Sequence, residues 1–191
     1  MRKITLTVLL LSALSFFAQA QEKTFSISGK IELDKGNLLV LTQRPGKIDT
    51  LAKTAIANRQ FSISGTTEEA VVAQLVIEGY AGGFVMILEP GEEYTANLTQ
   101  NGNGDIRGGK LQTAYNEYQK IVVNANAESR ALNKKASEAA AQKHFKTSKE
   151  LQTKANKVQE AAFAKMNNIV RKNADNVLAA YLQTAGSERI M

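Results

Sequence analysis

The stretch that decides the fold of the first half is FSISGKIEL at residues 25–33, where apolar and polar side chains alternate without a break. Its four large apolar residues share one face, as in a strand with one buried and one solvent-facing side. These are Phe25, Ile27, Ile31 and Leu33. Six further segments, bounded by Gly, Pro or Asn turn signals, are predicted as strands. They are residues 38–42, 50–57, 60–65, 71–78, 83–89 and 94–99.

Two features of these strands bear on how they pack. The pentapeptide Phe-Ser-Ile-Ser-Gly occurs at residues 25–29 and again at 61–65. It could be a duplicated binding element. We interpret it instead as two equivalent inward-facing strands, whose glycine permits a bulge or a close approach of strands. Residues 38–41 and 71–77 are more continuously apolar, which predicts cover on both faces, one of them supplied by a helix.

The composition changes at about Gly109. Residues 21–109 hold 12 of the 13 glycines and both prolines, whereas 110–185 contain neither. Apolar or small residues recur at spacings of three and four over 111–139 and 151–169, which predicts two helices. The predicted fold class is α+β: an N-terminal antiparallel β-sandwich or open barrel of 7–8 strands, followed by a C-terminal helical hairpin and a short third helix.

The helix ends are predicted from capping signals. The stretch Thr147-Ser148-Lys149-Glu150 has the form of a capping box, so the second helix is expected to begin at Thr147 after a break at 143–146. The third helix is expected to start at Asp175 and to end before Gly186. The helical face most suited to contact the sheet carries large aromatic side chains. Its residues are Tyr115, Tyr118 and Val122.

The N-terminus has the pattern of a secretory signal peptide. Two basic residues precede an apolar run over 4–17, and the small residues of Ala18-Gln19-Ala20 follow. The run is shorter than the roughly 20 residues that span a bilayer, so cleavage between Ala20 and Gln21 is expected rather than anchoring. The predicted organisation is a signal peptide at 1–20, a β domain at 21–109 and a helical region at 110–191. The protein is then periplasmic or otherwise exported, without stable membrane insertion after cleavage.

The charge is divided unevenly between the two halves. Residues 21–109 hold 8 basic and 11 acidic side chains, whereas 110–172 hold 13 basic and 5 acidic ones. The basic half could be the electrostatic footprint of an anionic lipid, polysaccharide or nucleic acid. Export argues against nucleic acid as a partner. Because the lysines are distributed around the helices, a merely solvated surface is the favoured interpretation.

The sequence offers few groups for chemistry. It contains no cysteine, which excludes disulfides and thiol nucleophiles. The single histidine, His144, has no second imidazole near it and is interpreted as a solvated turn residue rather than a ligand or base. The neighbouring carboxylates Glu68-Glu69 and Glu92-Glu93 point to opposite faces of a strand. The glycine-rich segments 79–83 and 102–109 are predicted as ordinary turns. We therefore expect no catalytic residue, no cofactor and no metal.

Several motifs together resemble a known family. They are FSISGKI at 25–31, LLVL at 38–41, FSISG at 61–65, ILEPG at 87–91 and NADNVLAAY at 173–181. The chain resembles the domain of unknown function 4369, over essentially all of the mature sequence. That domain typically stands at the N-terminus of Bacteroidetes envelope proteins whose C-terminal half is thioredoxin-like, as in thiol-disulfide interchange and alkyl hydroperoxide reductase/thiol-specific antioxidant proteins. The resemblance implies no functional residues, and the Cys-x-x-Cys of a thioredoxin-like half is missing here.

A shorter resemblance concerns Asp49-Thr50-Leu51. It is similar to the Asp-Ser/Thr-aliphatic signal for O-glycosylation in exported Bacteroidetes proteins, with Thr50 as the acceptor. The alternative is that these three residues simply begin a strand.

Three functions are compatible with the sequence. The leading prediction is a non-catalytic exported accessory or binding module that contacts an envelope protein or glycan. The second is a truncated or split relative of thiol-disulfide oxidoreductases that works with a separate thioredoxin-like protein. The third is a basic periplasmic holdase-type chaperone that clasps acidic or unfolded clients.

Overall fold

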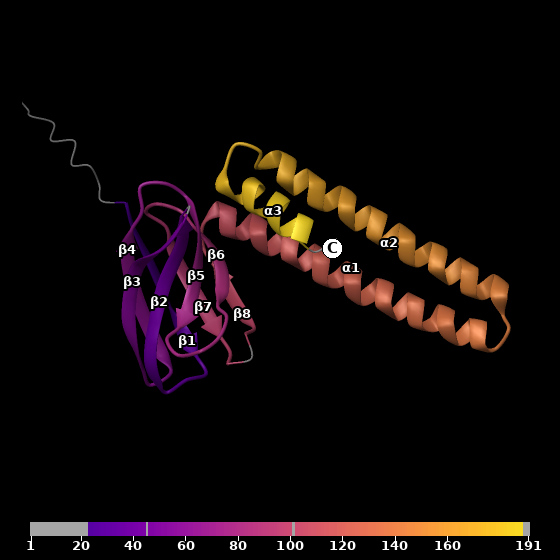
Figure 1. Cartoon of the computed structure of the whole chain (residues 1–191), viewed down its shortest axis with the longest axis horizontal. Coiled ribbons are helices and arrows are strands. Elements are labelled where there is room, and N and C mark those ends of the chain that lie inside the picture. Colours follow the sequence, from indigo (N-terminus) through magenta and orange to yellow (C-terminus); the bar gives the residue numbers. More distant parts are fainter. Residues whose placement is uncertain (1–22, 45, 101, 189–191) are drawn as a thin grey trace, which may run out of the picture.

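The computed structural model describes residues 23–44, 46–100 and 102–188. In this part of the chain, eight strands are followed by three helices (Figure 1). The elements are β1 (Thr24–Ile31), β2 (Lys35–Arg44), β3 (Lys47–Ala57), β4 (Gln60–Thr66), β5 (Val71–Ile77), β6 (Phe84–Leu88), β7 (Glu93–Leu98), β8 (Gly104–Arg107), α1 (Lys110–Ala141), α2 (Phe145–Lys172) and α3 (Val177–Glu188). The predicted α+β class is confirmed. The predicted signal peptide and its cleavage site, Ala20/Gln21, lie outside the described residues.

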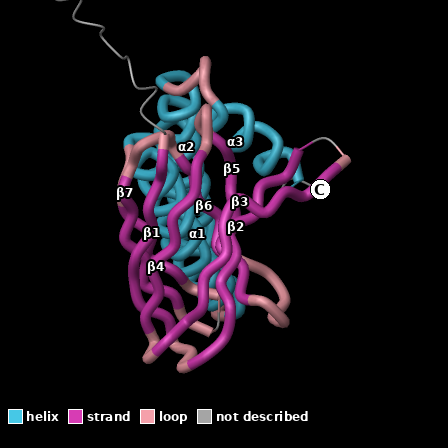
Figure 2. The backbone as a smooth tube through the Cα atoms, turned by 90° about the vertical axis from the view of Figure 1, so that its left-hand side faces the viewer, coloured by secondary structure: helices cyan, strands magenta, loops and turns pink. Residues whose placement is uncertain are grey.

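All eight strands belong to one sheet, in the order β6-β5-β2-β3-β4-β1-β7-β8. The sheet curls into a nearly closed barrel (Figure 2), so the open barrel is the correct one of the two predicted forms. The purely antiparallel arrangement is wrong at one place, because β1 and β7 pair in parallel. The other edge of β1 is already taken by β4, so β7 adds to its free edge.

The barrel encloses the main hydrophobic core. The least exposed of its large side chains, none above 1% exposed, come from β1, β2, β5, β6 and β7. They are Phe25, Ile27, Leu38, Val40, Leu75, Met86, Leu88 and Tyr94. Residues 25–33 alternate as predicted, with Ile31 also buried and Leu33 packed partly against the core. Each large side chain buried in this way stabilises the fold by about 1.5–3 kcal/mol.

The two copies of the repeated pentapeptide pair with each other. In the antiparallel register of β1 and β4, Phe25 lies opposite Gly65, and Gly29 lies opposite Phe61. A Cβ atom on Gly65 would come within 2.7 Å of the Phe25 ring, and one on Gly29 would overlap the carbonyl oxygen of Ala96 on β7. The interpretation as inward-facing strands with a close approach is confirmed, since each glycine makes room for a neighbour.

The prediction of a turn over all of 102–109 is wrong. Residues 104–107 form β8, which pairs with β7 from Leu98↔Gly104 to Thr95↔Arg107. The segment shows no clear alternation because Ile106 is its single large apolar residue, and the burial of Ile106 against the barrel core decides its structure. Residues 79–83, by contrast, connect β5 to β6 without regular structure, as predicted.

The predicted antiparallel hairpin is formed by α1 and α2 (Figure 1). The predicted start of α2 at Thr147 is wrong, because α2 begins at Phe145 with His144 as its N-cap. Ser148 of the supposed capping box is instead buried inside α2. The turn is shorter than expected because Lys143 adopts a left-handed conformation, with a φ of 63°, which reverses the chain within three residues.

Small residues line the contact between α1 and α2, which we call the hairpin seam. Its buried side chains are Ala125, Ser129 and Ala136 from α1, and Ser148, Ala155, Ala162 and Ile169 from α2. The α2 members follow one another at intervals of seven residues, the spacing of a coiled-coil seam. Side chains this small let the two helix backbones approach closely.

The third helix is capped by Asn176, whose side-chain oxygen accepts the backbone N–H of Leu178 at 3.0 Å. The predicted start at Asp175 is therefore displaced by two residues, because α3 begins at Val177. The predicted end before Gly186 is wrong, because α3 extends to Glu188.

The helices pack on the barrel through a second hydrophobic cluster. It joins Ile87 of β6 and Val72 of β5 to residues of all three helices, among them Tyr115, Tyr118 and Leu178. The rings of Tyr115 and Tyr181 lie 6.0 Å apart. The predicted contact face is confirmed for its two tyrosines, whereas Val122, further along α1, lies outside the cluster.

The two strands predicted to be covered on both faces behave differently. Val72 of β5 is covered by the helical cluster on one side, while Leu75 of the same strand is buried in the barrel. On β2, Leu39 and Leu41 stay half-exposed, because the helices cover β5 and β6 instead. No helix in the described part of the chain combines the length and the apolarity needed to cross a bilayer.

Candidate functional site

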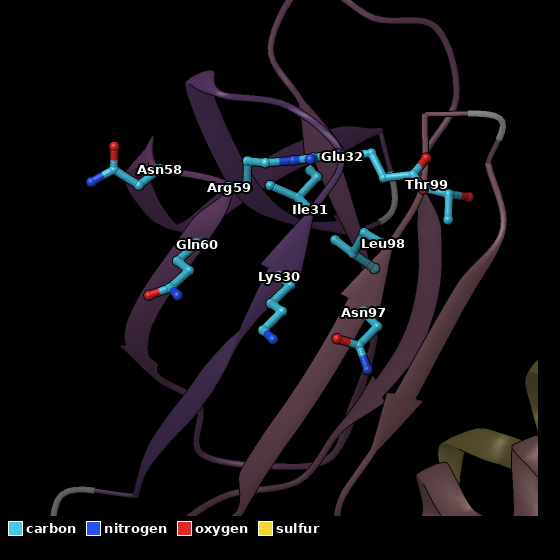
Figure 3. A pocket seen from close by; sticks show the side chains of 9 residues that line it. All are labelled: Lys30, Ile31, Glu32, Asn58, Arg59, Gln60, Asn97, Leu98 and Thr99. Atoms are coloured by element: carbon cyan, nitrogen blue, oxygen red, sulfur yellow. The ribbon is translucent and has the colours of Figure 1, made fainter.

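An open polar pocket of about 430 Å³ lies at one end of the barrel (Figure 3). It is formed where β1 and β7 end and where a tight turn joins β3 to β4, and we call it the rim pocket. Nine residues line it: Lys30, Ile31, Glu32, Asn58, Arg59, Gln60, Asn97, Leu98 and Thr99.

The β3–β4 turn places the Arg59 side chain in the rim pocket. Asn58 and Arg59 both have positive φ, 51° and 61°, as in a two-residue type I′ hairpin turn. Such turns favour Asn followed by Gly, so Arg59 occupies the position of the glycine. Its carbonyl oxygen accepts the N–H of Ile31 at 3.0 Å, which ties the turn to the end of β1. Its Nε lies 3.9 Å from Asp34, a solvent-exposed ion pair of little energetic weight.

A row of polar side chains crosses three adjacent strands beside Arg59. Lys30 on β1 is in register with Gln60 on β4 and with Asn97 on β7. All three side chains are exposed, and Figure 3 shows them side by side on the neighbouring strands. This row and Arg59 together supply two cations and two amides, which can hydrogen-bond an anionic or polar ligand.

The far side of the rim pocket is held by Glu32 and Gln100. The Gln100 side chain donates to the carbonyl oxygen of Glu32 at 2.5 Å, and the Gln100 backbone N–H lies 3.4 Å from the Glu32 carboxylate. The N–H of Glu32 in turn donates to Leu98 at 3.1 Å. The nine lining residues thus combine two cations, one carboxylate, three side-chain amides and one hydroxyl with two apolar side chains.

A network of hydrogen bonds fixes the start of α1 on the barrel. The Glu89 carboxylate accepts the N–H of Leu111 at 2.8 Å, in the first turn of α1. The Tyr94 hydroxyl accepts the N–H of Glu89, also at 2.8 Å. Burial raises the pKa of Tyr94 to about 12. Gly109 is required here, because its φ is 62° and a Cβ atom would overlap the Glu89 carboxylate.

A second part of this junction bridges the two edge strands of the sheet. The Gln112 side chain, which is 1% exposed, accepts the N–H of Ile87 on β6 at 2.8 Å and donates to Asn116 at 2.8 Å. Asn116 donates to the carbonyl oxygen of Ile106 on β8 at 2.7 Å. Two helix side chains thus satisfy backbone groups of β6 and β8, which are not paired to each other.

The hairpin beyond this junction projects away from the barrel (Figure 1). Three large apolar side chains on it are mainly exposed: Val123 by 63%, Phe145 by 68% and Phe163 by 59%. The lysines of α1 and α2 all lie in the described part of the chain, and none of them is within ion-pair distance of a described carboxylate. The hairpin therefore presents unpaired cations together with isolated apolar side chains.

The residues singled out from the sequence lie far from one another. His144 is exposed in the hairpin turn, and Thr50 is exposed on β3 opposite Leu41. Asp49, beside Thr50, forms an ion pair with Lys47 at 2.5 Å. The glutamate pairs 68–69 and 92–93 are exposed on the barrel. The described residues contain no group of three His, Cys, Asp or Glu side chains that could hold a metal ion.

Sequence reasoning missed the residues that organise the site. The Asn58-Arg59 turn was recognisable as a turn, but nothing marked the Arg59 side chain as part of a pocket. Gln112 and Asn116 lie four residues apart on one helix face, a spacing that allows a side-chain pair, yet their partners on β6 and β8 depend on the tertiary structure.

The fold and these surfaces define a class of protein: a small eight-stranded barrel domain that carries a long helical hairpin. Residues 25–115 match the model of the family described as Domain of unknown function (DUF4369). These residues of the chain belong to that family, which confirms the resemblance seen in the sequence. The expected extent was too large, because residues 116–191, with the motif at 173–181, lie outside the match. A search of curated proteins found no match to the chain.

Proposed function

We propose that the protein is a non-catalytic exported binding module, in which the barrel is a rigid base and the hairpin is the contact arm for an envelope component. The observation that carries this proposal is that one end of the hairpin is attached to the barrel while the other end is exposed. Its base is fixed to the barrel by the Gln112–Asn116 bridge and by the Tyr115–Tyr118 cluster, whereas its outer part projects with exposed apolar and basic side chains.

A hairpin attached to a rigid barrel is suited to binding because a fixed arm lowers the entropic cost of association. A partner that contacts the outer hairpin meets a surface whose direction is already determined by the barrel, so less conformational freedom is lost on association. Exposed aromatic side chains such as Phe145 and Phe163 leave apolar area in water that a partner can cover.

Export is supported by the signal-peptide pattern of residues 1–20. An envelope role is what the resemblance described in the sequence analysis implies, because the resembled domain typically stands in envelope proteins. The same resemblance favours a second candidate function, in which the module works beside a separate thioredoxin-like protein. The sequence itself contains no cysteine to take part in thiol exchange.

Site-specific photo-crosslinking in the native host tests the proposal. A photoreactive amino acid replaces Phe145 or Phe163 on the hairpin, and the matched controls replace Ser62 or Thr95 on the exposed face of the barrel. We expect adducts with an envelope component from the hairpin positions and none from the barrel positions. Adducts from the barrel alone, a cytoplasmic location after fractionation, or turnover of a disulfide or peroxide by the purified protein would contradict the proposal.

A further inference from the structure

The outer end of the hairpin, residues 134–149, concentrates positive charge, and we call this segment the hairpin tip. It contains five lysines and a single carboxylate, Glu138. The lysines are Lys134, Lys135, Lys143, Lys146 and Lys149, and all are exposed. With a rise of 1.5 Å per residue, all five lie within about 10 Å of the turn along the helix axes. The tip is also the part of the hairpin farthest from the barrel (Figure 1).

An apolar side chain stands in the middle of these cations. Phe145 is the first residue of α2 and is 68% exposed, directly beside His144 and Lys146. An exposed phenyl ring with lysines before and after it in the sequence, at the outer end of a projecting hairpin, matches the composition of segments that enter the headgroup region of a membrane. There the ring reaches the acyl boundary while the ammonium groups stay among the headgroups.

The conformation of Lys143 supplies a second, independent observation. Helix α1 ends in a Schellman motif, in which the N–H of Lys143 donates to Ala140 at 2.9 Å and the N–H of His144 donates to Ala139 at 2.8 Å. Lys143 occupies the left-handed position, with a φ of 63°, where glycine is favoured. A cation therefore stands at the tip in a conformation that costs a non-glycine residue about 1–2 kcal/mol.

We propose that the hairpin tip docks on a lipid bilayer that carries anionic headgroups. This inference rests on the proposed role of the hairpin as a contact arm and names its partner. The lysines of the tip come from both helices and from the turn, and none of them has an ion-pair partner among the described carboxylates. Such an arrangement suits a fluid surface of many equivalent negative charges better than the shaped surface of an acidic protein.

The size of the effect follows from the charges. Each basic residue close to an anionic membrane strengthens partitioning by a factor of about five. Three lysines removed together therefore weaken it by roughly 100-fold, and the loss of the ring weakens it by about 10-fold. High salt suppresses the electrostatic part, because the screening length falls to about 3 Å at 1 M ionic strength.

Vesicle co-sedimentation of the purified protein tests the inference. The vesicles contain phosphatidylcholine alone, or phosphatidylcholine with phosphatidylglycerol, at low and at high salt. We expect binding only to the anionic vesicles at low salt. A variant with Lys143, Lys146 and Lys149 changed to Gln should lose roughly 100-fold in partitioning. Its matched control changes Lys110, Lys120 and Lys172, near the barrel, to Gln and should lose less than about 3-fold, because those sites lie far from the bilayer.

Two single substitutions separate binding from folding. Phe145→Ala should weaken partitioning by about 10-fold, whereas Ile48→Ala, at a comparably exposed apolar side chain on β3 of the barrel, should leave it unchanged. Lys143→Gly should raise the melting temperature and still weaken partitioning by about five-fold, because it relieves the left-handed lysine and removes a charge.

Absence of binding to anionic vesicles, equal binding to neutral vesicles, or an equal loss in the barrel-proximal control would overturn the lipid inference. Crosslinks from Phe145 to an envelope protein, without vesicle binding, would also overturn it and would leave the contact-arm proposal standing. A cytoplasmic location would contradict the proposed function independently of the vesicle results.

Discussion

The barrel is packed internally by large side chains, whereas the hairpin is packed internally by small ones. The barrel core consists of large residues such as Phe25, Leu75 and Met86, whereas the hairpin seam consists mainly of alanine and serine. Each buried CH₂ group contributes about 0.8 kcal/mol, so the barrel gains far more from removing apolar surface from water. The hairpin depends instead on close helix contact along its length and on its mounting at the barrel. We expect its outer part to open locally before the barrel unfolds.

The largest expected effect is a loss of barrel stability caused by a substitution in the repeated pentapeptide. In Gly29→Ala, the new methyl group would overlap the backbone of Ala96, and the two strands can separate only by breaking their pairing. We expect the free energy of unfolding to fall by about 3 kcal/mol. Urea denaturation measures it, with Gly91→Ala as the control, since its left-handed glycine faces open space and the cost there is about 1 kcal/mol. Equal losses at the two glycines would disprove the close packing of β1 on β7.

The next effect tests whether the junction couples the two regions. Gln112→Ala leaves the N–H of Ile87 without its buried acceptor, so we expect a loss of about 2 kcal/mol in the free energy of unfolding. Amide exchange of Ile87 should become faster at the same time. The exposed neighbour Thr113→Ala, which removes only a bond to Gly109 within the helix, is the matched control. An unchanged exchange rate at Ile87 would show that the bridge does not protect the β6 edge.

A substitution in the hairpin seam sharpens the difference between the two cores. Ala155 is fully buried between the helices, so Ala155→Leu forces them apart and should destabilise the hairpin by about 1–2 kcal/mol. Hydrogen exchange should accelerate along α1 and α2 beyond the junction, while the barrel strands keep their protection. Ala161→Leu, on the exposed side of α2, provides the control. Accelerated exchange throughout the barrel would show that the two regions unfold as one unit.

The smallest expected effect concerns the pH dependence of the junction. Tyr94→Phe removes the acceptor of the Glu89 N–H and should lower the free energy of unfolding by about 1 kcal/mol at neutral pH. The pKa of Tyr94 is raised from 10.0 to about 12 by burial, so the unfolded chain releases this proton first as the pH rises. The wild type therefore loses stability between pH 10 and 12 through this group.

Denaturation of both proteins across that pH range measures the difference. The stability of Tyr94→Phe should fall less steeply, because all other titrating groups are shared. Parallel curves for the two proteins would show that the Tyr94 hydroxyl is not protected by the fold.

The strands and helices that follow their own periodicity could be predicted from the sequence. The alternation around Ile27 and the seven-residue recurrence through Ala155 each reflect burial on one side of a regular element. Strand β8 could not be predicted, because its single large apolar residue, Ile106, gives no period. The parallel pairing of β1 with β7 was equally hidden, since a strand pattern does not specify which edge another strand will join.

The candidate surfaces were predictable to a smaller degree. The excess of lysine in the second half and the exposure of His144 follow directly from the sequence. The position of Phe145 does not follow from the sequence, because it depends on where α1 ends. Helix α1 ends at a left-handed Lys143, in a position where glycine is the usual residue. The role of Gln112 could not be predicted either, because it depends on the edge of β6, which only the tertiary structure brings next to α1.

The placement of Gln112 and Asn116 has a consequence for how the protein can be divided. The first turns of α1 fill the gap between the edge strands β6 and β8, where they bond backbone groups that no neighbouring strand pairs. The family match extends to residue 115 on the same helix. A fragment cut at Gly109 would leave the edges of β6 and β8 unpaired, and unpaired edge strands favour association of one molecule with the next. An excised barrel that stays monomeric must therefore retain the helical turns that carry both side chains.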